Sequence, residues 1–173
     1  MESMEARMVK LYARNNNHVA LHAIPGHFAT SHSHINFYID MTSLKTRANE
    51  AQEVAKSLAG DYVNSTVVDT IVCMDGTEVV GAYLAQEFEK RGFRNTNLHD
   101  TIYVVTPEYN ANNQLIFRDN TIPAIKGKNV ILLLATTTTG LTVRRSLECV
   151  QYYGGTVRGI SSIFSTVKKV GGM

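Results

Sequence analysis

Several features that would assign this protein to a class are scarce in its sequence or missing from it. Only two cysteines occur among 173 residues, Cys73 and Cys149, and they form neither a CxxC motif nor a disulfide framework. Both lie in apolar runs, where a buried free thiol is the usual outcome. No apolar run approaches the ~18 residues that a membrane-spanning helix needs. We therefore expect neither redox chemistry nor a membrane-embedded chain.

An excess of charge of one sign is missing as well. The 17 basic and 15 acidic residues give a formal net charge of +2, without a long basic block. Lys168 and Lys169 are typical of a solvated tail rather than of a nucleic-acid surface. The first residues carry charges where a signal peptide would be apolar. We expect a cytoplasmic protein with neither a nucleic-acid nor a membrane partner.

What remains is a composition typical of a globular chain. Apolar residues make up 44% of the sequence and charged residues 18%. A chain of this length can bury a core without disulfides or metal ions to hold it together. The sequence contains no internal repeat, low-complexity tract or linker. It therefore predicts a single domain over residues 1–173.

Strands and helices are predicted to alternate along most of the chain. Apolar residues at helical spacing predict a lead helix over residues 2–14, ended by the asparagines at 15–17. Extended structure with a turn at 31–33 is predicted over residues 27–41. Further helices are expected at 46–59, at 78–91 and from 141; further strands at 67–73, 101–105, 129–135 and 156–164; and a long loop or irregular hairpin at 107–120. This order is typical of a mainly parallel α/β sheet, with ligands at the carboxyl ends of its strands.

The junction after the most apolar strand is the strongest local signal. The apolar run 130–135 is followed by the loop residues Thr136, Thr137, Thr138, Thr139, Gly140, Leu141 and Thr142 and then by an amphipathic run. Such a junction holds backbone N–H groups and hydroxyls at the positive end of a helix, which favours a phosphate. No Asp or Glu lies between Asn129 and Arg145, so the loop has no carboxylate for a sugar hydroxyl or a metal. A polar turn with a threonine helix cap is the alternative.

Three histidines, His27, His32 and His34, gather in the early segment. If the segment is extended, His32 and His34 share one face, which is a geometry that a metal could use. No cysteine lies nearby and no acid lies between His27 and Asp40, so we assign no metal site. Contact with a ligand and an ordinary surface role remain alternatives for these side chains.

Taken together, three segments resemble the type I phosphoribosyltransferases, and most of all the orotate phosphoribosyltransferases. In that family a VLLVDD strand runs into a VITTGGT loop that holds the 5′-phosphate of phosphoribosyl pyrophosphate (PRPP), and residues 130–142 align with it without a gap. Residues 26–40 resemble the family's early segment, with its G-x-F, serine-rich turn and aromatic ending. Residues 67–85 fall where the family places its pyrophosphate loop. The resemblance covers residues 20–165 and implies a mainly parallel central sheet flanked by helices, with a small N-terminal hood.

The resemblance also implies a set of site residues and partners. It implies a phosphorylated ribose or nucleotide as the ligand, Mg²⁺ as the cofactor and a homodimer as the assembly. It identifies no catalytic residue. The implied phosphate-binding residues are Thr136, Thr137, Thr138, Thr139, Gly140 and Thr142; Asp75, Gly76 and Thr77 form the pyrophosphate loop; and Arg118 is the cation of the flexible loop.

Departures from the family pattern lie where its chemistry would be. The two acids that the family aims at the ribose hydroxyls correspond to Leu134 and Ala135. In an unchanged pose, each unpaired hydroxyl costs about 1–3 kcal/mol. The family's lysine-rich mobile loop corresponds to a segment whose only cation is Arg118, and its terminal Asp-Arg corresponds to Ser161-Ser162 or nearby positions, which makes orotate a poor substrate guess.

Two functions follow from this pattern. One is a glycosyltransferase that transfers phosphoribose from PRPP to an unidentified nucleobase. The other is a catalytically inactive regulatory module that binds a nucleotide or a related phosphate.

Overall fold

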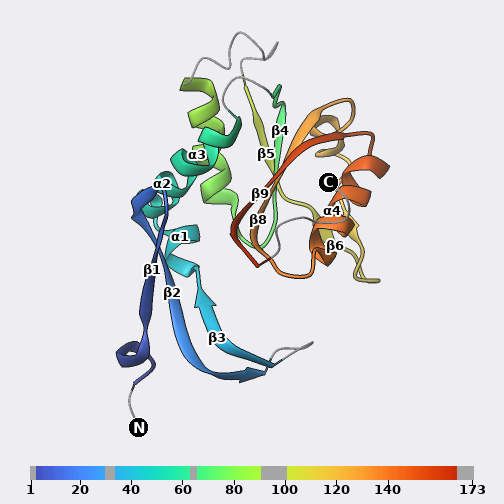
Figure 1. The fold of residues 1–173 in the computed structure, drawn as a ribbon. Coiled ribbons are helices and arrows are strands. Elements are labelled where there is room, and N and C mark those ends of the chain that lie inside the picture. Colours follow the sequence, from blue (N-terminus) through green and yellow to red (C-terminus); the bar gives the residue numbers. More distant parts are fainter. Residues whose placement is uncertain (1–2, 30–33, 63–65, 91–100, 167–173) are drawn as a thin grey trace.

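A four-stranded parallel sheet lies at the centre of the fold, and an antiparallel sheet precedes it (Figure 1). The computed structural model describes residues 3–29, 34–62, 66–90 and 101–166. The parallel sheet has the order β5-β4-β8-β9, with bounds β4 (Thr70–Cys73), β5 (Tyr103–Val105), β8 (Asn129–Thr137) and β9 (Thr156–Ser165). All three of its pairings are parallel. The mainly parallel sheet predicted from the sequence is therefore confirmed.

Strand β8 is apolar from residue 130 to residue 135 because both of its faces are covered there. Ile131 and Leu133 face one core cluster, and Leu132 and Leu134 face the other. The first cluster is completed by helices α2 (Ala48–Ala59) and α3 (Glu78–Lys90), and the second by α4 (Leu141–Tyr152). A parallel strand between two helical layers is buried on both faces, so its sequence does not alternate with polar residues. Figure 1 shows α2 and α3 on one side of the sheet and α4 on the other.

The helix predicted at 46–59 begins earlier and is broken at Arg47. Short α1 (Thr42–Thr46) precedes α2. The Thr42 N–H donates to Asp40 Oδ1 at 2.9 Å, and this bond is the main reason why the pKa of Asp40 lies below its usual value. The 3₁₀ turn η2 (Gly60–Tyr62) follows α2 directly, and a second one, η4 (Ile122–Ala124), precedes β8.

The N-terminal sheet contains β1 (Val9–Ala13), β2 (Asn16–Ala29) and β3 (His34–Asp40), in that spatial order and all antiparallel. The predicted lead helix at 2–14 is wrong. Only the 3₁₀ turn η1 (Met4–Arg7) forms, and the asparagines at 15–17, predicted to end a helix, lead into β2 instead. Of the extended structure predicted at 27–41, the parts at 27–29 and 34–40 are confirmed, whereas the turn predicted at 31–33 lies outside the described residues.

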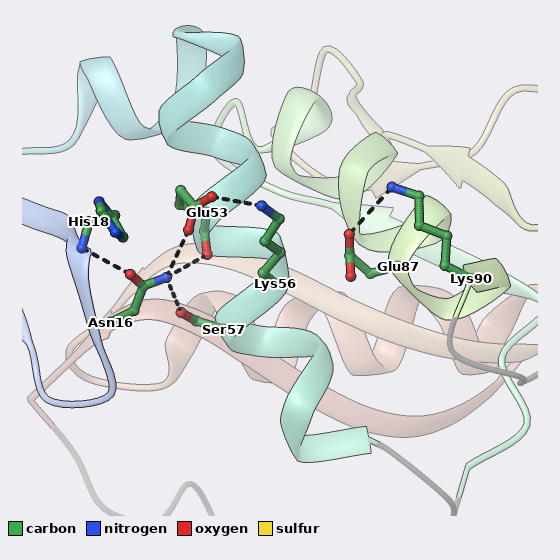
Figure 2. Close-up of polar contacts among 7 residues, drawn as sticks. All are labelled: Asn16, His18, Glu53, Lys56, Ser57, Glu87 and Lys90. Atoms are coloured by element: carbon green, nitrogen blue, oxygen red, sulfur yellow. Dashed lines mark hydrogen bonds and ion pairs between the residues drawn. The ribbon is translucent and has the colours of Figure 1, made fainter.

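Asn16 fastens this antiparallel sheet to α2 (Figure 2). Its Nδ2 group donates to Glu53 Oε2 at 3.2 Å and to Ser57 Oγ at 3.1 Å. Lys56 pairs with the same Glu53 at 2.8 Å, and the bonds from Lys56 and Asn16 lower the pKa of the Glu53 carboxyl group. Beneath these polar contacts, Val19 of β2 belongs to the same core cluster as α2 and α3. The antiparallel sheet and the parallel sheet therefore share one apolar core.

Residues 107–120 form a hairpin. Of the two structures predicted for this segment, a long loop and an irregular hairpin, the hairpin is confirmed. Its strands are β6 (Glu108–Tyr109) and β7 (Leu115–Ile116). Asn110 organises the turn, because its Oδ1 accepts from the N–H groups of Asn112 and Gln114, each at 2.9 Å. The hairpin lies against α4, where Phe117 and Tyr153 meet edge to face with ring centroids 5.4 Å apart.

Within the described residues, no helix is both long and apolar enough to cross a membrane. Both cysteines are buried free thiols, as the sequence predicted. Burial raises the pKa of Cys73 to about 12 and that of Cys149 to about 11. Neither thiol is a thiolate at neutral pH, so both act as small apolar residues.

Candidate functional site

A tight loop joins the carboxyl end of β8 to the first turn of α4. Gly140 makes this turn possible because its φ of 77° lies in the left-handed region that glycine adopts without strain. The first N–H groups of a helix have no acceptor within the helix. The first turn of the described α4 holds no acidic residue. One of these N–H groups, that of Leu141, donates to the Thr139 hydroxyl at 3.4 Å, as in the threonine-capped turn that the sequence offered as the alternative. The positive end of the helix dipole still faces this loop and attracts anions.

An open pocket of about 140 Å³ lies at this junction. Its described lining consists of Asp75 and the continuous run Thr136, Thr137, Thr138, Thr139, Gly140, Leu141, Thr142 and Val143. All six residues that the sequence nominated for a phosphate therefore line one pocket. It lies at the carboxyl edge of the parallel sheet, where open α/β folds bind their ligands.

Thr137, one of the residues that line this pocket, has an unused hydroxyl group. The residue is 6% exposed, and among the described residues its Oγ1 is the one buried side-chain oxygen without a hydrogen-bond partner. An unpaired buried polar group costs about 1–3 kcal/mol. A ligand oxygen in the pocket would give this hydroxyl the acceptor that the described residues do not provide.

The turn after β4 brings Asp75 to the same pocket. Asp75 and Gly76 both adopt left-handed backbone conformations, with φ values of 58° and 76°. Next to them, the buried Thr77 hydroxyl lies 2.8 Å from the Met74 carbonyl oxygen and 3.1 Å from that of Leu133. The Met74 N–H also donates to the Leu133 carbonyl at 2.8 Å. The turn is therefore fixed to β8 at defined points, and the position of Asp75 is built into the fold.

The Asp75 carboxylate lies between opposing influences. The residue as a whole is exposed, yet the atoms around its carboxyl group desolvate it, and this raises the pKa of Asp75 above its usual value. Attraction to Lys45 and a hydrogen bond from the Ala135 N–H oppose that rise. Asp75 lines the same pocket as Thr136 and Thr137 at the end of β8.

Lys45 is a site residue that the sequence analysis missed. It lies on α1, and its Nζ donates to the Asp75 carbonyl oxygen at 2.9 Å. No motif could have identified it, because thirty residues separate it from the turn that it contacts. The packing of α1 against α3 brings the cation to the edge of the site.

Leu134 and Ala135, which take the place of the family's acids, are both buried. Leu134 is 0% exposed and packs with Val143 and Val150 of α4, and Ala135 is 3% exposed. The Leu134 side chain therefore belongs to the dry core rather than to the pocket. Asp75 supplies a carboxylate at this edge in spite of the apolar pair.

The remaining nominated residues lie elsewhere. Gly76 and Thr77 shape the turn but do not belong to the described lining of the pocket. Arg118 is exposed on the hairpin and pairs with Glu108 at 2.8 Å, so the structure does not bring it to Asp75.

His27 and His34 contact each other across β2 and β3. The distance from His27 Nε2 to His34 Nδ1 is 2.8 Å. His32 lies outside the described residues. In the described part of the chain, no group of three or more His, Cys, Asp or Glu residues could hold a metal ion.

Comparisons with known proteins agree on the fold. No family model matches the sequence, and no curated protein matches it. The orotate phosphoribosyltransferase of Mycobacterium tuberculosis, solved with Fe(III) dicitrate, matches with a TM-score of 0.56 and 14% identity over 84% of this chain and 90% of that one. The same enzyme solved with PRPP gives a TM-score of 0.53 and 12% identity over 75% and 81% of the two chains.

A purine enzyme matches to a similar extent. The adenine phosphoribosyltransferase of Thermoanaerobacter pseudethanolicus has a TM-score of 0.54 and 14% identity, over 94% of this chain and 85% of that one. Identities this low establish shared architecture and nothing finer. The chain therefore has the type I phosphoribosyltransferase fold, as its sequence predicted.

Proposed function

We propose that this chain, built on the type I phosphoribosyltransferase fold, binds the 5′-phosphate of a phosphoribosyl group or nucleotide at residues 136–142, which comprise the end of β8, the loop after it and the start of α4. The observation that carries the proposal is the buried, unpartnered hydroxyl of Thr137 in a pocket formed by the start of a helix. Hydroxyl and backbone N–H groups would together surround the phosphate oxygens. Both donor types suit a phosphate, because its oxygens accept several hydrogen bonds at once.

The enzymatic form of this proposal is transfer of phosphoribose from PRPP to an unidentified nucleobase. The fold supports it, since the similar structures come from orotate and adenine phosphoribosyltransferases, and one of them holds PRPP. In such a reaction the loop would fix the phosphate end, so that C1′ of the sugar lies at the crevice. Only interactions that strengthen in the transition state would then accelerate the transfer.

A catalytically inactive binding module is the second proposal. It is favoured by the burial of Leu134 and Ala135, which leaves the end of β8 without a side-chain carboxylate for ribose hydroxyls. The pairing of Arg118 with Glu108 favours it further, because the cation of the hairpin already has a counter-ion. Such a module would bind a nucleotide or a related phosphate and report its presence to a partner.

Mg²⁺ is part of the enzymatic proposal. Magnesium is usually held by one or two carboxylates together with substrate phosphates and water. Asp75 fits the protein's share of such a site, because its carboxylate lines the pocket. The ion would neutralise phosphate charge.

We also propose a cytoplasmic homodimer. One face of the antiparallel sheet supports self-association, since the cross-strand register places Val9, Leu11 and Phe37 on it together. They are 47%, 47% and 54% exposed. Sedimentation over a concentration series tests this assembly, and a monomer throughout would contradict it.

A thermal-shift panel tests the phosphate site. The ligands are inorganic phosphate, ribose 5-phosphate, nucleoside monophosphates and PRPP, each with Mg²⁺ and with EDTA. We expect at least one phosphorylated ligand to raise the melting temperature, because binding to the native state alone stabilises it. If none does, the site does not bind phosphate. Pyrophosphate release from PRPP with a panel of bases then separates the enzyme from the binding module.

Thr137→Val is the matched variant for this panel. It keeps the shape of the side chain and removes the unpaired hydroxyl, so we expect the ligand-free protein to keep or gain stability while phosphate affinity falls. Thr156→Val, at the exposed start of β9, is the control for a threonine outside the pocket. Unchanged phosphate affinity in Thr137→Val would show that this hydroxyl does not contact the ligand.

A further inference from the structure

The pocket combines a cradle for an anion with one fixed carboxylate. Among its described lining residues, Asp75 is the one that carries a charge. A carboxylate beside a bare phosphate repels it, since like charges at short range destabilise each other. An ionised carboxylate only accepts hydrogen bonds, so its presence indicates that the ligand carries a donor beside its phosphate oxygens.

The position of Asp75 is too well determined to be incidental. The Thr77 hydroxyl and the Met74 N–H fix its turn to the carbonyl of Leu133 on β8. From α1, the Lys45 Nζ donates to the backbone carbonyl of Asp75 at 2.9 Å, and the Ala135 N–H lowers the pKa of the carboxyl group. An ionised carboxylate has about four acceptor positions, and the bond from Ala135 uses one of them. The others remain available to donors in the pocket.

Two groups with opposite preferences therefore lie in one pocket. Thr137 and the first turn of α4 favour an anion, and the unpartnered Thr137 hydroxyl points to a ligand independently of Asp75. Asp75 favours a hydrogen-bond donor. A phosphate ester of a polyol satisfies both, because its phosphate and its hydroxyl groups are separated by a few bonds.

Resting on the function proposed above, we infer that Asp75 accepts a hydrogen bond from a hydroxyl group of the bound phosphate ester and so selects sugar phosphates over inorganic phosphate. The carboxylate that selects the sugar thus comes from the turn after β4, while the strand end at Leu134 and Ala135 stays apolar. Lys45 supports this role as a positioning residue, because its charge and its bond to the Asp75 carbonyl hold the turn in place.

The test compares two probes on two variants by calorimetric titration in EDTA. The probes are ribose 5-phosphate and inorganic phosphate. Asp75→Asn is the informative variant, because asparagine tolerates a φ of 58° and keeps the size of the side chain, while the charge is lost and one acceptor oxygen becomes an NH2 donor. Asp119→Asn, at an exposed site outside the pocket, is the matched control.

We expect the wild type to bind ribose 5-phosphate more tightly than phosphate. Asp75→Asn should weaken ribose 5-phosphate binding about 10-fold, because a hydrogen bond to a charged acceptor is replaced by one to a neutral amide oxygen. The same variant should bind inorganic phosphate equally well or better, since a repelling charge is gone, and the control should match the wild type.

The two readouts separate the inference from the function on which it rests. If the wild type binds neither probe, the phosphate site itself fails. If phosphate binds but Asp75→Asn lowers both affinities alike or changes neither, the phosphate site stands and the role of Asp75 is overturned. A preference for ribose 5-phosphate that appears only after Mg²⁺ is added also overturns it, because the carboxylate would then act through the ion.

Discussion

At the scale of single residues, the ionised Asp75 carboxylate is expected to lower the stability of the folded protein, although it serves the proposed binding site. Its folded pKa is raised, mainly by desolvation, so the folded chain binds more protons than the unfolded chain between the two pKa values. Stability therefore falls as pH rises through that window, and the penalty persists above it. Below the unfolded pKa both states are protonated, and the penalty vanishes.

Asp75→Asn should therefore raise the free energy of unfolding at pH 7. In strongly acidic solution it should leave the free energy of unfolding almost unchanged. The measurement is thermal unfolding of both proteins at pH 7 and at about pH 3, with Asp119→Asn as the exposed control. An equal change at both pH values would show that the effect arises from packing rather than from charge.

Adding a charge at Leu134 should destabilise the protein, whereas removing the charge of Asp75 should stabilise it. The Leu134 side chain is fully buried between β8 and α4. We expect Leu134→Asp to destabilise the protein by about 3 kcal/mol or more, because an unpaired carboxylate would enter the dry core. Leu134→Met keeps the volume and should cost less than about 1.5 kcal/mol in denaturant titration. A well-folded Leu134→Asp would show that β8 can rotate its end toward the pocket.

At the scale of elements, we expect a Gly→Ala substitution to change stability in opposite directions at Gly81 and at Gly60. A Cβ at Gly81 of α3 would overlap the Sγ of Cys73 on β4, because the helix lies directly on the strand there. At Gly60, nothing lies within 4 Å and the backbone is helical, with a φ of −57°.

Gly81→Ala should therefore cost about 1–3 kcal/mol through overpacking. Gly60→Ala should add about 0.4–1 kcal/mol, because it lowers the entropy of the unfolded chain. Chemical denaturation of the two variants beside the wild type measures both values. Equal effects would indicate that α3 can shift away from β4.

The parallel half of the fold was predictable because its signals do not compete. The apolar run of β8, the glycine at 140 and the polar turn before α3 each favour one local structure. The first residues are different, since Met8, Leu11 and Tyr12 fit helical spacing while Val9, Leu11 and Ala13 alternate as in a strand. Pairing with β2 decided the outcome, and no local pattern encodes that pairing.

The same limit applied to the candidate site. Its threonine loop is one continuous segment, so the sequence displayed it whole. Lys45 and the bond from Ala135 to Asp75 depend on which helix lies beside which strand, and they became visible only in three dimensions. Arg118 was nominated by its place in the chain, but its partner Glu108 lies on the same hairpin.

At the scale of the whole molecule, the two sheets should unfold together, in keeping with the single domain predicted over 1–173. Val19 of β2 and Leu44 of α1 pack in the same cluster as Ile71 and Leu133 of the parallel sheet. Circular dichroism and tyrosine fluorescence should therefore report one transition with a common midpoint.

Asn16→Ala should lower that midpoint by about 2–4 °C per kcal/mol lost without splitting the transition. Two separate transitions, in the variant or in the wild type, would mean that the antiparallel sheet is an independent unit. Hydrogen exchange of β2 amides against β8 amides would locate the earlier one.

The hairpin organised by Asn110 has a consequence for the speed of binding. Its turn is closed by hydrogen bonds within the chain, and its strand β7 lies against α4. A segment that is ordered beforehand adds no slow closing step after the first encounter. We expect phosphate esters to associate in a single exponential phase whose rate rises linearly with concentration. Their dissociation should also be a single phase, because no slow opening step precedes it.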